Sequence, residues 1–131
     1  MKRDPDLVRD ILVQIEDGRE YFSTTSDETA AILGTENEES LSEEEAERID
    51  YHMHLLVGAG FIETQGTGDG WIVNRITWAG HDFLDSVRDD EVWSQTKAGV
   101  KHAGGFTIDL AKELAKGLIR KKIEDHTGVS L

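Results

Sequence analysis

One stretch of this chain, from Ser42 to Thr77, limits the possible folds more than any other, because it combines the signals for a helix, a helix end and a β-hairpin. Ser42 precedes Glu45 by three residues, so the two side chains can each accept a hydrogen bond from the other's backbone amide, as in a capping box. Apolar residues then recur at steps of three and four, at Ala46, Ile49, Met53 and Leu56. This spacing predicts a helix with one buried face.

A hairpin is expected after this helix. Gly58 and Gly60 can adopt the positive φ that ends a helix, and Phe61 and Ile62 then begin an apolar run. The turn that follows, GTGDG, contains three glycines, and the strand after it alternates apolar and polar residues. We expect Ile72 and Ile76 on that strand to face the core. A helix followed by a hairpin is the order of elements in a winged helix-turn-helix.

Other elements are marked by capping residues, prolines and glycines on either side of this stretch. We expect a helix from Asp4 to Asp17, a short strand at Tyr21 and Phe22, a short helix from Asp27 to Leu33, a helix capped by Thr77 and reaching Val87, a helix from Asp89 to Gly104, and a helix from Thr107 to Ile123. Leu56 and Trp78 are expected to be buried.

The predicted fold class is mainly α with a small β-hairpin. A winged helix-turn-helix-like core would occupy about residues 1–88, and additional C-terminal helices would occupy about residues 89–125. A chain of 131 residues, with 37% apolar residues, has the size of one domain and can form one hydrophobic core. We therefore expect residues 1–131 to form a single domain.

The net charge of −13 is distributed unevenly along the chain. Residues 1–70 contain 5 lysines and arginines against 18 acidic residues, whereas residues 71–131 contain 9 of each kind. Between Glu36 and Asp50 there are eight carboxylates and a single cation, Arg48. A phosphate backbone that approached this segment would be repelled.

Catalysis, cofactor binding and metal binding have little support in the sequence. The chain contains no cysteine, no Ser-His-Asp pattern and no phosphate-binding loop. His52 and His54 are two residues apart, so a regular helix directs them to nearly opposite sides, and we expect surface or partly buried histidines. No apolar run is long enough to span a membrane and no signal segment is apparent. We expect a cytoplasmic protein without membrane contact that is not an enzyme.

Four segments, MKRDPDLVRDIL, YHMHLLVGAGFIE, TWAGHDFLDSVRDDEVW and ELAKGLIRKKI, occur in this order and cover nearly the whole chain. In this order they resemble a family of small bacterial and phage-associated proteins that is catalogued as a domain of unknown function. The chain departs from the family pattern at residues 19–45, which are longer and more acidic. The resemblance implies a winged-helix-like fold that is often encoded on phage or prophage, and it provides no catalytic residues to carry over.

The leading functional hypothesis is a non-catalytic protein-interaction module. Its candidate site residues are the acidic positions of the central helix, namely Glu43, Glu44, Glu47 and Asp50. The expected partner is a protein, with a basic protein as one option, and a homodimer through the C-terminal helix is a further option.

Two alternatives stay open. A DNA-binding transcriptional regulator would use the wing and the basic C-terminal helix, through Arg75, Arg120, Lys121 and Lys122, although the charge of the chain disfavours it. An acidic mimic of DNA would instead occupy a nucleic-acid-binding protein.

Overall fold

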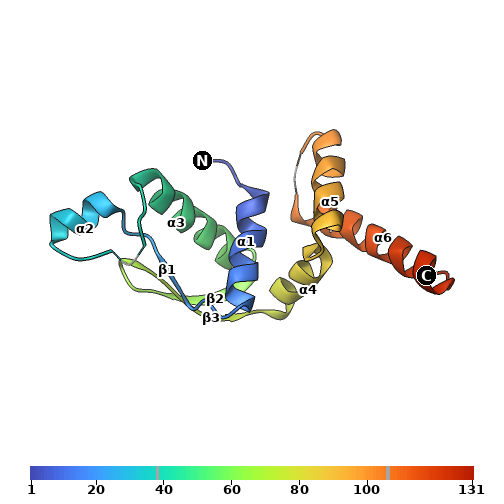
Figure 1. Ribbon diagram of the computed structural model, residues 1–131, viewed down its shortest axis with the longest axis horizontal. Helices are drawn as coiled ribbons and strands as arrows, with labels where there is room; N and C mark the ends of the chain where they lie inside the picture. The colour runs from blue at the N-terminus through green and yellow to red at the C-terminus, as the bar shows by residue number, and fades with distance from the viewer. Residues whose placement is uncertain (38, 106) are drawn as a thin grey trace. The chain divides into compact units, whose positions relative to one another are not determined.

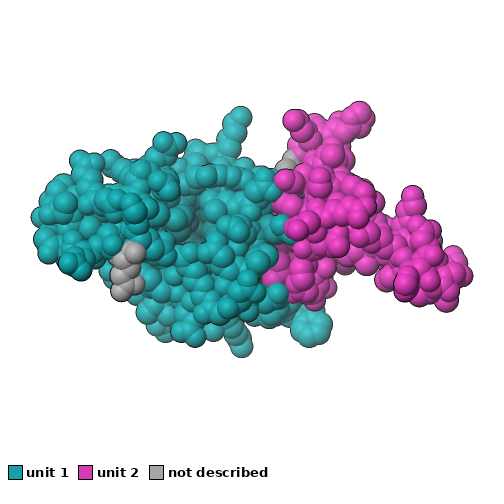
Figure 2. Space-filling view, in the orientation of Figure 1, with its two compact units in different colours: residues 1–81 teal, residues 82–131 magenta. Residues whose placement is uncertain are grey.

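Six α-helices and three β-strands form in the residues that the structure describes, which are 1–37, 39–105 and 107–131 (Figure 1). The structure is a computed structural model. The elements are α1 (Pro5–Glu16), β1 (Tyr21–Ser23), α2 (Asp27–Leu33), α3 (Glu43–Gly58), β2 (Ile62–Gly66), β3 (Gly70–Ile76), α4 (Trp78–Val87), α5 (Asp90–His102) and α6 (Ile108–Thr127). The chain divides into two compact units, residues 1–81 and residues 82–131, and the division falls within α4 (Figure 2). The predicted mainly α class is confirmed.

Helix α1 begins at the capping residue that the sequence indicates. The Asp4 carboxylate accepts hydrogen bonds from the amides of Asp6 and Leu7, at 3.0 and 3.3 Å, and Pro5 occupies the first turn, where its missing N–H costs nothing. The helix ends before Gly18, which has a φ of +112°. Its buried face consists of Val8, Ile11 and Leu12.

Helix α3 has the predicted capping box. The Glu45 amide donates to the Ser42 hydroxyl at 3.1 Å, and the Ser42 amide donates to the Glu45 carboxylate at 3.3 Å. The buried residues of the helix are Ala46, His52, Met53 and Leu56. The prediction of surface or partly buried histidines was wrong for His52, which has no exposed surface, because it lies on the face that packs into the core.

The three strands form one antiparallel sheet in the order β1-β3-β2. The short strand predicted at Tyr21 and Phe22 is confirmed. In the pairing of β2 with β3, Glu63 lies opposite Arg75 while Thr64 lies opposite Val73, so Asn74 is an extra residue on β3. This β-bulge interrupts the alternation of β3 and directs Val73 to the same side as the buried Ile76.

The bulge explains why the prediction that Ile72 faces the core was wrong. Ile76 is buried as predicted, whereas Ile72 is 40% exposed. Ile72 is the neighbour of the buried Val73, and adjacent strand residues point to opposite faces of a sheet. The sequence pattern alone does not reveal where a bulge shifts this alternation.

The core of residues 1–81 lies where α1 and α3 pack against the sheet. Helix α1 contacts β3, α3 contacts β2, and the two helices contact each other. Figure 1 shows both helices on the same side of the strands. The buried apolar residues here include Val8, Ile11, Leu12, Phe22, Met53, Leu56, Phe61, Ile62, Val73 and Ile76. Helix α2 contacts α3 beside this core.

Helix α4 is capped by Thr77, whose hydroxyl accepts a hydrogen bond from the Gly80 amide at 3.1 Å, as the sequence predicts. Trp78 was expected to be buried, but 89% of its surface is exposed. The buried apolar side chains of this helix, Phe83, Leu84 and Val87, lie on the side of the helix opposite to Trp78. Because it lies on the side of α4 away from these buried residues, Trp78 points to solvent.

Residues 82–131 contain the contact between α5 and α6. Asp89 caps α5 and Thr107 caps α6, as predicted, and α6 continues to Thr127, one turn beyond the expected end. Ala111 and Ala115 are fully buried, and small side chains of this kind allow close packing of helices. No helix among the described residues is both long and apolar enough to cross a membrane.

Candidate interaction surface

The acidic residues of α3 follow from the amphipathic pattern of that helix. Because Ala46 and Met53 face the core, the glutamates of the first two turns are left on the exposed side. Carboxylates at this end of a helix also interact favourably with its dipole. Glu43, Glu47 and Asp50 are spaced by four and three residues and share one face, whereas Glu44 is turned by about 100°.

Three of the four predicted site residues line the same hollow, which we call the acidic groove. It has a volume of about 350 Å³ and is lined by Thr24, Ser26, Thr29, Glu43, Ala46, Glu47, Asp50 and Gly68. Its walls come from the segment between β1 and α2, from α2 and α3, and from the turn between β2 and β3. The structure thus places Glu43, Glu47 and Asp50 together, and it does not place Glu44 with them. No lysine or arginine is among the described residues that line the groove.

Asp50 also connects α3 to the sheet. Its carboxylate accepts a hydrogen bond from Trp71 Nε1 at 2.8 Å and lies 3.6 Å from His54 Nε2. The His54 ring stands edge-on to the Trp71 ring, with 4.7 Å between the ring centres. Asp50 therefore has a structural partner, while Glu43 and Glu47 are exposed. No local pattern in the sequence indicates this contact, because Trp71 is 21 residues away from Asp50.

Helix α2 is held in place by hydrogen bonds to the segment before α3. The Asp27 amide donates to the Leu41 carbonyl at 2.8 Å, and the Asp27 carboxylate accepts from the Ser40 hydroxyl at 2.8 Å and from the Leu41 amide at 3.3 Å. The bond from Ser40, followed by the bond from Leu41, lowers the pKa of the Asp27 carboxyl. These bonds fix one wall of the acidic groove. Glu38, one of the eight carboxylates counted in the sequence, lies outside the described residues.

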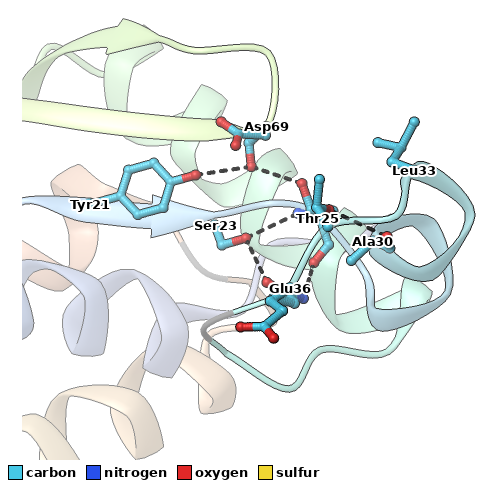
Figure 3. A pocket seen from close by; sticks show the side chains of 9 residues that line it. Tyr21, Ser23, Thr25, Ala30, Leu33, Glu36 and Asp69 are labelled. Atoms are coloured by element: carbon cyan, nitrogen blue, oxygen red, sulfur yellow. Dashed lines mark hydrogen bonds between the residues drawn. The ribbon is translucent and has the colours of Figure 1, made fainter.

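A second hollow lies on the other side of the segment between β1 and α2 (Figure 3). It has a volume of about 530 Å³, and it is lined by Tyr21, Ser23, Thr25, Ala30, Leu33, Thr35, Glu36, Asn37 and Asp69. Ser23 and Thr25 line this hollow while Thr24 and Ser26 line the acidic groove, as expected for alternate residues of an extended segment. The Thr25 hydroxyl donates to the Asp69 carbonyl at 3.2 Å, which connects this segment to the turn between β2 and β3.

The basic residues of the DNA-binding alternative have acidic partners or point in different directions along their own helix. Arg75 donates two hydrogen bonds of 2.8 Å to Glu63, which lower the pKa of Glu63 and raise the pKa of Arg75. Arg120, Lys121 and Lys122 are consecutive residues of α6, so they point in directions about 100° apart. Lys122 lies 3.4 Å from the Asp89 carboxylate. Among the described residues, no group of three or more His, Cys, Asp or Glu side chains is placed to hold a metal ion.

Together these elements define a mainly α-helical protein with a small antiparallel sheet and an acidic groove beside it. The chain belongs to the family described as "Hypothetical protein (DUF2513)", which matches residues 2–106. An uncharacterized protein of Haemophilus influenzae is 29% identical over 128 residues, covering 94% of this chain and 99% of the relative. No solved structure matches the chain. The predicted membership of a family of unknown function is confirmed.

Proposed function

We propose that this protein is a non-catalytic, winged-helix-like module that binds a basic segment of a protein partner in the acidic groove. One observation carries the proposal: Glu43, Glu47 and Asp50 line a single hollow whose lining includes no lysine or arginine among the described residues. The order of elements in residues 1–81, together with the position of β1 beside β3, supports a winged-helix comparison. An association of this chain with phage or prophage stays a prediction.

Electrostatics favours a cationic partner over a nucleic acid. Residues 1–81 contain 6 lysines and arginines and 18 acidic residues, and two exposed carboxylates lie on the groove wall. Each carboxylate attracts a cation about 4 Å away by about 1 kcal/mol even at the dielectric constant of water, and it repels a phosphate by a similar amount. The fork of an arginine side chain can in addition donate paired hydrogen bonds to a carboxylate.

The DNA-binding alternative has less support. Arg75 is the basic residue that the hairpin would present to a phosphate, and both of its hydrogen bonds to Glu63 would compete with that contact. A nucleic-acid-binding protein remains a partner class that fits the groove, since such proteins present lysine and arginine on their surfaces.

The experiment compares two double charge reversals that change the net charge equally. Glu43→Lys with Glu47→Lys alters the groove, and Glu28→Lys with Glu44→Lys alters exposed residues at the starts of α2 and α3 that do not line it. Binding to a fluorescent Lys/Arg-rich peptide is measured by anisotropy at low salt. We expect the groove variant to lose about tenfold or more in affinity, equivalent to about 1.4 kcal/mol, and the control to lose less than about threefold.

Equal losses in the two variants would mean that only the overall charge attracts the peptide. The groove would then be refuted as the binding site of the basic segment. A duplex DNA probe is measured in parallel at about 50 and 200 mM salt. DNA binding that weakens steeply with salt, without peptide binding, would replace the proposal with the DNA-binding alternative.

A further inference from the structure

His52 has a defined protonation state in this structure because both of its ring nitrogens are bonded. The Asp4 amide donates to Nε2 at 2.8 Å, and Nδ1 lies 2.8 Å from the Arg48 carbonyl oxygen. A carbonyl can only accept, so Nδ1 carries a hydrogen, and an amide N–H can only donate, so Nε2 carries none. The geometry therefore requires the neutral imidazole with its hydrogen on Nδ1.

The residue that donates to His52 has two further contacts. The Asp4 carboxylate caps α1 and forms an ion pair with Arg48. Arg48 and His52 are four residues apart on α3, so they lie on neighbouring turns of the same face and both reach Asp4. We call Asp4, Arg48 and His52 the Asp4 cluster. It joins the start of α1 to the middle of α3.

We propose that the Asp4 cluster is an acid-sensitive latch that releases the residues before α1 when His52 takes up a second proton from solvent. The added proton occupies Nε2 and turns this nitrogen into a donor that faces the Asp4 amide, which is also a donor. The hydrogen bond between them is lost, and the Nε2–H group is left buried without an acceptor in that position. Detachment of Asp4 from α3 admits water to the protonated ring.

The surroundings of His52 do not stabilise its charged form. The charged and titratable groups in contact with His52 include Asp4, Arg48 and Tyr51. The Asp4 carboxylate is engaged with Arg48 and with the first amides of α1, and the cationic side chain of Arg48 disfavours a second positive charge nearby. Burial lowers the pKa of His52 and outweighs the bond to the Arg48 carbonyl, which acts in the opposite direction.

The test follows two signals of the full-length, isotope-labelled protein by NMR, between about pH 7.5 and about pH 5. One is the titration of the His52 ring, and the other is solvent exchange of the Asp4 amide, corrected for its intrinsic pH dependence. We expect protection of this amide to fall by about tenfold for each pH unit from about pH 6.5 down to the His52 midpoint, below which the amide exchanges without protection. In His52→Gln, whose amide side chain does not titrate, protection should not change in this way. In His54→Gln, which alters a histidine 64% exposed on its side chain, it should fall as in the wild type.

Two results would overturn the proposal. The first is an Asp4 amide that stays protected while the His52 ring becomes protonated. The second is an equal loss of protection in His52→Gln, which would place the titrating group elsewhere. If His52→Gln does not fold, the test uses the wild type only. A difference of more than about 0.5 pH unit between the midpoint of the His52 ring titration and the midpoint of Asp4 amide release would then refute the latch.

Discussion

Replacement of Leu56 by alanine tests the packing of α3 against the sheet. Leu56 is 2% exposed on the buried face of α3, so nearly the whole side chain is removed from water on folding. The substitution removes three carbon groups, at about 0.8 kcal/mol each, which gives about 2.4 kcal/mol for the lost transfer free energy. The cavity that remains adds about 1 kcal/mol. We expect Leu56→Ala to lower the free energy of unfolding by about 3 to 4 kcal/mol.

Trp78→Ala is the matched comparison, because the sequence predicts burial of both residues while the structure buries only Leu56. Trp78 is 89% exposed, so its truncation should cost less than about 0.5 kcal/mol. Both variants are unfolded in urea and followed by far-ultraviolet circular dichroism, since Trp78→Ala removes a fluorophore. We expect a midpoint lowered by roughly 2 to 3 M for Leu56→Ala and little change for Trp78→Ala.

The reverse order of stability in the two variants would refute the packing of α3 through Leu56. A loss below about 1 kcal/mol for Leu56→Ala would show that α3 does not pack through this residue. A loss above about 2 kcal/mol for Trp78→Ala would show that this side chain is covered in solution.

The remaining predictions concern a close backbone approach, a helix cap and a titration. A Cβ at Gly80 would lie 2.2 Å from the Phe61 carbonyl oxygen, so Gly80→Ala should cost about 1 to 3 kcal/mol in urea unfolding, while Gly58→Ala, with nothing within 4 Å, should be neutral or slightly stabilising. Equal stability of these two variants would contradict the close contact. Ser42→Ala should cost about 1 kcal/mol in the same assay through loss of the capping box, and an unchanged midpoint would argue against the cap. Because the pKa of His52 is lowered in the folded protein, the unfolded chain binds the proton more tightly. The contribution of His52 to the free energy of unfolding is therefore complete above about pH 6.5. Below this pH it decreases by about 1.4 kcal/mol per pH unit until the folded pKa is reached. A stability that rose on acidification through this range, relative to His52→Gln, would contradict the sign.

Most helix boundaries could be predicted from the sequence because they depend on neighbouring residues. Asp4, Ser42 and Thr107 bond to amides two or three positions away in the chain, so short segments contain all the partners that a cap needs. The candidate acidic face was predicted for a similar reason, since the apolar spacing of α3 shows which positions are left exposed.

Other features required the tertiary structure because their partners are remote in sequence. Donation to His52 comes from Asp4, 48 residues away, and Asp50 is bound by Trp71, 21 residues away. Neither the burial of His52 nor the structural role of Asp50 is contained in the local pattern around these residues.

The sequence by itself determined the helices of this protein, the approximate position of its hairpin, its family and the location of its excess negative charge. Only the tertiary structure decided that a bulge at Asn74 turns Ile72 outward, that Trp78 faces solvent, and that Glu47 lines a groove while Glu44 does not. The physical reason is the range of the interactions. Caps and helix periodicity act within a few residues, whereas strand register, burial and the walls of a groove depend on segments that meet only when the chain has folded.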